Sequence, residues 1–556
     1  MIQLEQMKGL IQMKKALPLG IMDFSELRVN NYFFVDKTLM IKDYLDRKNK
    51  VTLITRPRRF GKTLNMSMMS EFFDITKDSS KIFKGTKIME TEYAKEMNQW
   101  PTIFISFANA KQNKYSIVKT IKLLIRKEYD RYEHIFQNNM SKFDQNEYQN
   151  IVNELMSIDD GILDHISNAL SFLMERLEKY YGKKVMVIID EYDTPFIEAH
   201  INGFYEDISS GLSMLLHNAL KTSTSLQYAM LTGIQRVAKE NIFSDLNNLV
   251  VCTVKDEEYS QYFGFTEKET DELLKEYDLE LNQDVKNMYN GYRFGNINIY
   301  NPWSIINYAQ RKKMESYWIN TSSNNMIKNS LKKVDSSFGE QYEELISQGY
   351  LDTLVYLETS FYEQAETGSL WGLFINAGYL TIDKQIRNNY YRLVIPNEEV
   401  QNEFKSLTAY YLNAKDADFE NLYNAFETAN EKLFTTTYTN ILETLPSSFD
   451  LKDENSYHMM VLGLCAWMRN IYEVESNREE GLGRGDIVLI AKRNDIPSYV
   501  LEFKYSKEEC DLDQLANVAI QQIIDKKYDM KLKGKIIYIG LAHHKKSVKV
   551  KWVNRN

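Results

Sequence analysis

The stretch that decides the fold of the first half of this chain runs from residue 51 to residue 66 and reads VTLITRPRRFGKTLNM. A short β-branched run leads into a turn that contains Gly61, Lys62 and Thr63, and a helical pattern follows. A phosphate-binding loop has the pattern G-x-x-x-x-G-K-[ST] between a strand and a helix. Arg56 occupies the first glycine position here. The stretch therefore predicts a phosphate-binding loop with one altered position.

Each residue of the Gly-Lys-Thr triplet has a role in such a loop. Backbone N–H groups and the helix N-terminus point at the phosphates, and Gly61 lets the backbone approach them closely. Lys62 adds a charge on the β- and γ-phosphates, and the Thr63 hydroxyl binds Mg²⁺. Arg56 and Arg59 add positive charge that can meet phosphate or a neighbouring acidic surface. The alternative is a chance Gly-Lys-Thr triplet at the start of a helix.

A second motif supports the nucleotide site. Residues 185–191, VMVIIDE, form an apolar run that ends in two acids. A buried strand would deliver Asp190 to the carboxyl edge of a parallel sheet, beside the phosphate loop. Asp190 is then expected to hold Mg²⁺ through water, and Glu191 to polarise the attacking water. Together with the loop, this strand predicts an ATP site.

Several other short apolar runs alternate with helical segments in the N-terminal half, which predicts an α/β fold with a parallel sheet covered on both faces. The expected strands, besides 51–55, are 102–107, 185–189 and 228–232. Beyond residue 300 the pattern changes to short helices, with a hairpin near 378–395 that is compatible with a winged-helix module. We expect three domains: a P-loop domain over 1–300, a helical module over 301–450, and an α/β domain over 451–556.

The C-terminal domain contains a second group of chemically active residues. Asp486 begins an expected strand, and Glu502 and Lys504 lie on the next one in the stretch YVLEFKY. Alternation along a strand puts Glu502 and Lys504 on one face, and a hairpin pairing would bring Asp486 to Glu502. Two carboxylates and a strand carbonyl suit Mg²⁺ or Mn²⁺, and Lys504 can orient a water and stabilise charge. The alternative is a solvent-facing cross-strand salt bridge.

Composition limits the class of protein. The chain has 556 residues and a formal net charge of -9, so general nucleic-acid binding is not favoured, although residues 526–556 are strongly basic. By itself, that basic region is read more readily as a solvated surface than as a nucleic-acid site. Three widely separated cysteines predict neither zinc nor a disulfide framework, which favours a reducing cytoplasm. We expect no signal peptide and no membrane span.

The N-terminal motifs resemble the bacterial AAA-ATPase-like family, relatives of STAND-type P-loop ATPases. The resemblance rests on LPLGIMDFSELRVNNYFFVDKT, RPRRFGKT, IIDEYDTP and LTGIQRVAKENIFSDLNNL, within about residues 15–300. It implies that Arg56 is a family trait, and that the loop from Arg56 through Arg59 and Phe60 to Thr63 binds ATP. It also implies a sensor at Thr232 and makes Arg236 a candidate γ-phosphate sensor, with a surface arginine as the alternative.

Residues 450–556 resemble the PD-(D/E)XK nuclease superfamily, in the branch fused to AAA-ATPase-like domains. The resemblance rests on GRGDIVLIA and YVLEFKY, with Gln522 on the following helix. It implies that Asp486, Glu502 and Lys504 are catalytic, that Glu454 is an auxiliary metal ligand, and that Gln522 is a positioning residue. The segment 393–400, LVIPNEEV, also matches the family, but no chemistry is assigned to it.

The sequence therefore predicts an ATPase whose nucleotide state controls a Mg²⁺-dependent nuclease, with Mn²⁺ as a possible substitute. DNA is the favoured substrate, a homo-oligomer is a possible form, and no membrane association is expected. Bacterial defence or mobile-element biology is the context that the resemblance suggests. The alternatives are an ATPase scaffold with a non-cleaving nuclease-like domain, and a nuclease that uses the ATPase fold only as a platform.

Overall fold

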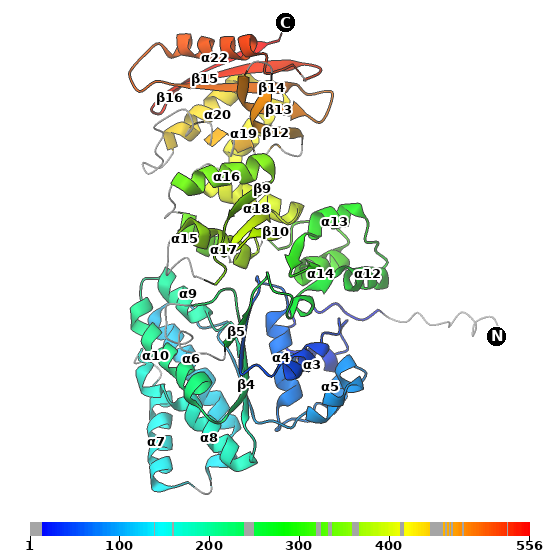
Figure 1. The fold of residues 1–556 in the computed structure, drawn as a ribbon, viewed down its shortest axis with the longest axis vertical. Coiled ribbons are helices and arrows are strands. Elements are labelled where there is room, and N and C mark those ends of the chain that lie inside the picture. The colour runs from blue at the N-terminus through cyan, green and yellow to red at the C-terminus, as the bar shows by residue number, and fades with distance from the viewer. Residues whose placement is uncertain are drawn as a thin grey trace, which may run out of the picture. The chain divides into compact units, whose positions relative to one another are not determined.

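The computed structural model describes most of the chain. The described residues are 14–137, 140–157, 161–237, 249–318, 324–331, 336–358, 366–411, 416–444, 457, 460, 461, 464, 465, 468, 471–480, 483–530 and 532–555. They group into two compact units, one comprising residues 1–321, 355–382 and 396–399, the other residues 322–354, 383–395 and 400–556 (Figure 1). The middle of the chain is thus shared between the two units. The predicted division at residues 300 and 450 stays a prediction.

The first unit is built around a five-stranded parallel sheet with the order β2-β3-β4-β1-β5. Its strands are β1 (Val51–Thr55), β2 (Thr102–Ser106), β3 (Val185–Asp190), β4 (Leu226–Gly233) and β5 (Leu249–Cys252). The predicted α/β fold with a parallel N-terminal sheet is confirmed. Because β1 and β3 flank β4, the ends of these strands meet at one edge of the sheet.

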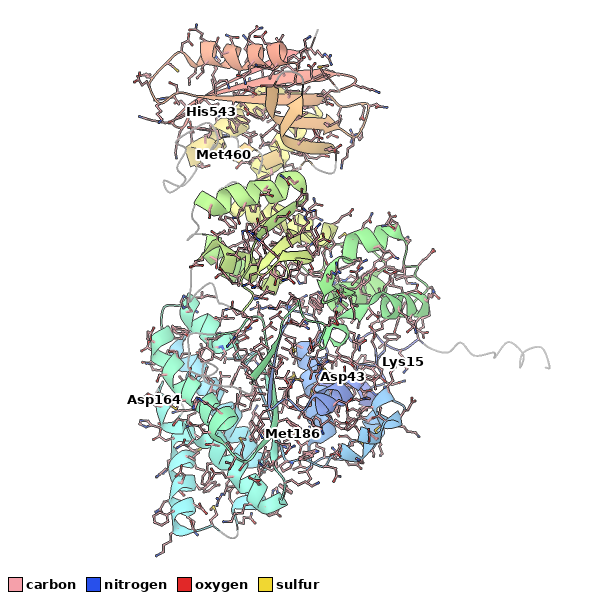
Figure 2. The ribbon with its side chains drawn as sticks, in the orientation of Figure 1. Lys15, Asp43, Asp164, Met186, Met460 and His543 are labelled. Carbon is pink, nitrogen blue, oxygen red and sulfur yellow. The ribbon has the colours of Figure 1, made fainter. Side chains whose placement is uncertain are left out.

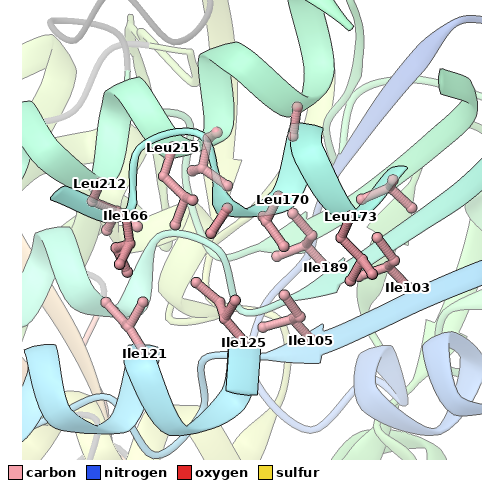
Figure 3. Close-up of a cluster of buried hydrophobic side chains, with 14 of the residues drawn as sticks. Ile103, Ile105, Ile121, Ile125, Ile166, Leu170, Leu173, Ile189, Leu212 and Leu215 are labelled. Atoms are coloured by element: carbon pink, nitrogen blue, oxygen red, sulfur yellow. The ribbon is translucent and has the colours of Figure 1, made fainter. Parts of the chain in front are cut away.

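Helices cover both faces of this sheet (Figure 1). One face packs against α6 (Lys114–Arg131), α8 (Ala169–Tyr181) and α10 (Tyr205–His217) through a large aliphatic core. Figure 3 shows part of that core, with isoleucines and leucines of β2, β3 and the three helices pointing toward one another. The other face packs against α4 (Lys62–Phe73), whose buried residues include Met66, Met69 and Phe72. Burying the sheet on both sides explains its continuous apolar strands, and Met186 of β3 lies in this interior (Figure 2).

Further elements complete the first unit. They are α2 (Phe24–Val29), α3 (Leu39–Arg47), α5 (Ser80–Phe83), α7 (Lys142–Met156), α9 (Thr194–Ile201), α12 (Glu267–Glu276), α13 (Gln283–Tyr289), α14 (Pro302–Arg311), α17 (Thr367–Ala377) and the small antiparallel sheet β6 (Phe265–Thr266), β8 (Ile297–Tyr300) and β7 (Tyr292–Phe294). The start of α14 is well defined locally, because Asn301 caps it through Trp303 N–H and Ser304 N–H and Pro302 takes the first turn.

The second unit contains two sheets. A three-stranded sheet has the order β10 (Thr381–Arg387), β11 (Tyr390–Val394) and β9 (Tyr350–Leu354), near helices α15 (Asn324–Leu331), α16 (Ser336–Gln348) and α18 (Glu398–Tyr411). The predicted hairpin corresponds to β10 and β11, while the winged-helix assignment stays a prediction. The larger sheet has five strands in chain order: β12 (Tyr472–Glu480), β13 (Gly483–Ala491), β14 (Ser498–Tyr505), β15 (Ile536–His544) and β16 (Ser547–Asn554).

The larger sheet has helices on both faces. One face packs against α19 (Asp416–Glu427) and α20 (Glu431–Thr444), and this core includes Ile487, Leu501 and Phe503. The other face packs against α22 (Leu512–Lys526) through Val488, Val500 and their neighbours. Strands β14 and β15 are parallel and are joined by α22, whereas the other pairs are antiparallel. The sheet is therefore mixed, and α19 and α20 belong to its core although they precede residue 451.

Two candidate catalytic sites

The phosphate loop leads directly into the start of α4 through residues with a left-handed backbone conformation. Gly61 has φ 81° and directly precedes the helix, and Arg59 has φ 68°. The Lys62 ammonium is buried and donates hydrogen bonds to the carbonyls of Arg56 (3.0 Å) and Pro57 (2.9 Å). Burial lowers the pKa of Lys62, and the nearby Glu191 charge partly offsets this effect. Lys62 thus binds the backbone of its own loop and lies near the acidic residues Asp190 and Glu191 at the end of β3.

Asp190 lies at the centre of the site and is wrapped by hydroxyl groups. One carboxylate oxygen accepts hydrogen bonds from Thr63 Oγ1 (2.8 Å) and Ser106 Oγ (2.9 Å), and the other accepts from Thr232 Oγ1 (2.8 Å). Burial raises the pKa of Asp190, and the Glu191 charge adds to the shift. The structure therefore brings together the predicted Thr63, Asp190 and Thr232. Ser106 was missed, although its place at the end of the strand next to β3 was a usable signal.

Glu191 and Asp193 shape the turn that follows β3. Glu191 has φ 50°, and its carboxylate accepts a hydrogen bond from Thr194 Oγ1 at 3.1 Å. Asp193 is buried and accepts hydrogen bonds from Ile234 N–H (2.8 Å) and Gln235 N–H (2.9 Å), just after β4. Burial raises the pKa of Asp193 to about 6. Sequence reasoning assigned no role to Asp193, which ties the end of β3 to the end of β4.

Arg56 has a structural task that the sequence did not reveal. Its side chain is fully buried, and its guanidinium donates to the carbonyls of Thr55 (2.8 Å), Cys252 (3.0 Å) and Glu258 (3.2 Å). It also lies over the Phe294 ring, with 5.1 Å to the centroid. Burial lowers the pKa of Arg56 to about 10. The side chain anchors the base of the loop. Because its guanidinium is used in these contacts, we do not include Arg56 among the proposed phosphate ligands.

The next loop residues contact segments beyond the parallel sheet. Arg59 is half-buried, and its guanidinium lies 3.9 Å from the centre of the Trp303 ring. Phe60 is buried, with its ring 4.9 Å from that of Tyr292 and 5.1 Å from that of Phe294. Phe60 is thus a packing residue in this structure, whereas Arg59 remains a candidate phosphate ligand.

Arg236, the candidate γ-phosphate sensor, forms an ion pair. Its guanidinium lies 3.1 Å from a carboxylate oxygen of Glu358, and Lys255 lies 3.3 Å from the other oxygen. Arg236 follows β4 by three residues, so it comes from the same strand end as Thr232. The sensor role stays a prediction.

The second candidate site lies on strands β13 and β14. The antiparallel register pairs Ile487 with Leu501, and beyond this pair the Asp486 carboxylate accepts a hydrogen bond from Phe503 N–H at 2.8 Å. Glu502 is almost completely buried at 1% exposure. Alternation places Asp486 and Glu502 on the face that packs against α22, while Ile487 and Phe503 lie on the opposite face. The predicted meeting of the two carboxylates is consistent with this register.

Lys504 and Gln522 both reach Glu502. Lys504 Nζ lies 3.1 Å from Glu502 Oε1 and donates to the Phe503 carbonyl at 2.7 Å. Gln522 of α22 donates to the same Glu502 oxygen, and its amide nitrogen lies 3.2 Å from the Tyr528 hydroxyl. The structure thus groups the residues that the sequence assigned to the nuclease, and adds Tyr528. The signal for Tyr528 was its position just after the helix that carries Gln522.

Two further residues of the C-terminal part differ in where they lie. Glu454, the predicted auxiliary metal ligand, lies outside the described residues. His543, in the basic C-terminal region, is fully buried in the C-terminal unit (Figure 2). Its ring stacks on Tyr457 with 4.0 Å between centroids and bonds the Tyr438 hydroxyl at 2.9 Å. Burial lowers the pKa of His543 to about 3, so this histidine is a neutral core residue.

The donor set at the second site suits a hard divalent cation. Two carboxylates come from neighbouring strands, and Lys504 supplies a positive charge beside them. Among the described residues no cluster of three or more His, Cys, Asp or Glu side chains forms a complete metal site. Asp486 and Glu502 thus fit Mg²⁺ as a partial shell that other oxygen donors would complete.

Comparison with known proteins agrees with the two domain resemblances. The model of a family described as predicted AAA-ATPase matches residues 18–243, and the model of the PD-(D/E)XK nuclease superfamily matches residues 452–553. The chain therefore carries an AAA-ATPase-like domain followed by a PD-(D/E)XK nuclease superfamily domain. A protein of Azotobacter chroococcum mcd 1, described as an uncharacterized protein in the vnfD 5′ region, is 26% identical over 401 residues, which cover 70% of this chain and 69% of that protein.

Membrane-spanning helices were also sought. Within the part of the chain that the structure describes, every helix is too short or too polar to cross a bilayer.

Proposed function

We propose that the AAA-ATPase-like domain binds ATP with Mg²⁺ and hydrolyses it. Backbone N–H groups at the start of α4 and the Lys62 ammonium would hold the phosphates, with Arg59 as a further cation at the loop. Thr63 and Asp190 would hold Mg²⁺, which neutralises charge on the phosphates. This assignment is supported by the 2.8 Å hydrogen bond between Thr63 and Asp190, which places both expected ligands side by side.

Glu191 is the proposed catalytic base of ATP hydrolysis. It follows Asp190 directly, at the end of β3, and has a left-handed backbone conformation. Its carboxylate would accept the proton of a water that attacks the γ-phosphate. Arg236 would supply positive charge to the transition state if it leaves Glu358, because a γ-phosphate competes for the same guanidinium.

We further propose that the C-terminal domain hydrolyses phosphodiester bonds in nucleic acid, with DNA as the preferred substrate. Asp486 and Glu502 would hold Mg²⁺ or Mn²⁺, which polarises the scissile phosphate when bound. Lys504 would orient the attacking water and stabilise negative charge on the phosphate. Gln522 fixes the Glu502 carboxylate by its hydrogen bond. The observation that carries this proposal is the convergence of Glu502, Lys504 and Gln522 at one oxygen.

The two sites in one chain suggest that nucleotide binding controls cleavage. When an ATPase domain and a nuclease domain share one polypeptide, the ligand bound to the first can change the activity of the second.

The three cysteines are free thiols, in keeping with a reducing cytoplasm. Control through a homo-oligomer, and a role in bacterial defence or mobile-element biology, belong to the same proposal.

The test is cleavage of a panel of nucleic acids by the full chain. Supercoiled plasmid, linear duplex, single-stranded DNA and RNA are incubated with Mg²⁺ or Mn²⁺, using the wild type, Glu502→Gln and a control, Glu509→Gln, at an exposed position. We expect cleavage of DNA by the wild type and the control, and none by Glu502→Gln. Equal cleavage by Glu502→Gln would reject the site. Binding without cleavage by any variant would favour the non-cleaving scaffold.

A further inference from the structure

Three side chains of the phosphate loop contact a second set of residues in the first unit. Pro57 lies against Gly378, where an added Cβ would be 3.1 Å from Pro57 Cβ. Arg59 lies over the Trp303 ring, and Phe60 packs against Tyr292, whose hydroxyl donates to the Gly378 carbonyl at 3.1 Å. A change in loop shape would therefore be felt by these neighbours, because close-packed contacts transmit small shifts.

Glu399 is the centre of the hydrogen bonds around Trp303. One of its carboxylate oxygens accepts from Tyr317 N–H (2.7 Å) and Trp318 N–H (2.8 Å), and the other accepts from Ser304 Oγ (2.8 Å). Glu399 is fully buried, so a charge there is costly unless it is compensated. Burial raises the pKa of Glu399, while its hydrogen bonds and, more weakly, the charge of Arg59 in the phosphate loop act in the opposite direction.

The chain runs from this cluster directly into the second unit. Glu399 is the second residue of α18, and the residues from Val400 onward belong to the second unit. Trp318 lies three residues before the point at which the chain first leaves the first unit, after Thr321. The hydrogen bonds of Glu399 thus hold together two places where the polypeptide passes from one unit to the other.

We infer that Glu399 is a positioning residue that links the phosphate loop, through Arg59 and Trp303, to the chain segments that enter the nuclease-containing unit. This inference rests on the proposed ATP site. The phosphates of a bound nucleotide would attract the Arg59 guanidinium away from the Trp303 ring, because a guanidinium binds phosphate, and its charge would then act less on Glu399. Binding at the loop therefore changes the charge balance at Glu399, and with it the hydrogen bonds to Tyr317 and Trp318.

A neutral side chain of the same shape separates this role from simple packing. In Glu399→Gln the amide oxygen still accepts hydrogen bonds from Tyr317 and Trp318, and the amide N–H₂ can donate to Ser304 Oγ. The negative charge of the carboxylate, on which Arg59 acts, is removed. Glu398→Gln is the matched control, since Glu398 is the neighbouring and exposed residue of the same helix turn. Trp303→Leu is the second variant, because it removes the ring under Arg59 at a half-buried position.

The experiment measures amide hydrogen exchange of the full chain with and without ATP and Mg²⁺, after ATP binding has been measured for each variant by calorimetry. We expect a change in exchange rate at Trp318 and over residues 397–411 on ATP addition in the wild type and in Glu398→Gln. We expect that change to be lost in Glu399→Gln and in Trp303→Leu while both still bind ATP. If Glu399→Gln does not fold, the Trp303→Leu result decides.

Two outcomes would overturn the inference. One is ATP binding by the wild type without any change in exchange at these residues, which leaves the proposed ATPase intact. The other is an ATP-induced change that persists in Glu399→Gln. Failure of the wild type to bind ATP would instead reject the proposed nucleotide site, and the inference with it.

Discussion

The two candidate sites of this molecule place their carboxylates in opposite ways. At the nucleotide site, Asp190 is surrounded by three hydroxyl groups that come from α4, β2 and β4. At the nuclease site, Asp486 and Glu502 come from two adjacent strands and are held by a backbone N–H, a lysine and a glutamine. The first depends on how a loop and several strand ends meet, and the second on the register of one strand pair.

This difference indicates which kind of substitution should affect each site most. The nucleotide site relies on a left-handed backbone conformation at Arg59, Gly61 and Glu191, which residues other than glycine rarely adopt. Such conformations persist only when surrounding contacts hold them. The nuclease site uses ordinary extended strands, so single side chains carry its function. Backbone changes should therefore act mostly on the first site, and side-chain changes mostly on the second.

The largest expected effect is at Asp486. We predict that Asp486→Asn lowers cleavage by more than about 100-fold, since loss of a direct metal ligand should exceed the range of about 10–100-fold for residues that support a ligand. The fold should persist, because the amide oxygen can still accept from Phe503 N–H. Initial rates on duplex DNA measure the effect, with Asp525→Asn at an exposed position of α22 as the control. A loss smaller than that of Gln522→Ala would contradict the assignment.

The second prediction concerns a buried acid near the loop. Burial raises the pKa of Glu399 from 4.5 to about 7. Below the unfolded pKa both states are protonated, and as pH rises from about 4.5 to about 7 only the unfolded state ionises, so the wild type loses stability. Relative to Glu399→Gln, the loss is up to roughly 3 kcal/mol. Thermal unfolding midpoints at pH 4.5 and 7.5 test this, and a pH-independent difference between the two proteins would contradict a raised pKa at Glu399.

The third prediction concerns Gln522. Because it donates to the same oxygen of Glu502 as Lys504 does, Gln522→Ala should lower cleavage by about 10–100-fold. The loss should be partly recovered at higher Mg²⁺ concentration if the glutamine orients a metal ligand. Gln521→Ala, at the adjacent exposed position, is the control. Equal rates for both variants would remove Gln522 from the site.

The smallest effect is expected at Gly61. The conformation at φ 81° favours glycine, and an added Cβ would meet no atom within 4 Å. Gly61→Ala should therefore weaken ATP binding only through backbone strain of about 1–2 kcal/mol, or roughly 5- to 30-fold in affinity. Calorimetric titration with ATP measures it, and cleavage in the absence of ATP should be unchanged. A loss of ATP-independent cleavage in Gly61→Ala would show that a change at the phosphate loop also acts on the second site without nucleotide.

Much of the fold was predictable because the strands are short apolar runs bounded by clear turns. The strand predicted at 51–55 agrees with β1, and those at 102–107 and 185–189 agree with β2 and β3 within one residue. The strands β5 to β9, β12 and β16 were not predicted. In β16 the apolar positions alternate with lysines, so that the basic composition concealed a strand.

The sites were predictable to the extent that they depend on local spacing. Alternation was enough to place Glu502 and Lys504 together, and strand order was enough to place Asp190 beside Thr63. The task of Arg56 and the role of Glu399 depend on contacts between residues far apart in the chain. No periodicity carries that information, which is why the segment 393–400 was recognised as a match without a chemical role.

Control of the nuclease by nucleotide at the loop can be measured by initial rates of plasmid cleavage. The full chain is assayed in Mg²⁺ with and without ATP, as wild type and as Lys62→Ala, which removes the ammonium that the loop encloses. We expect a cleavage rate that depends on ATP in the wild type and does not respond to ATP in Lys62→Ala. Active cleavage that is the same in both proteins, with or without ATP, would contradict it.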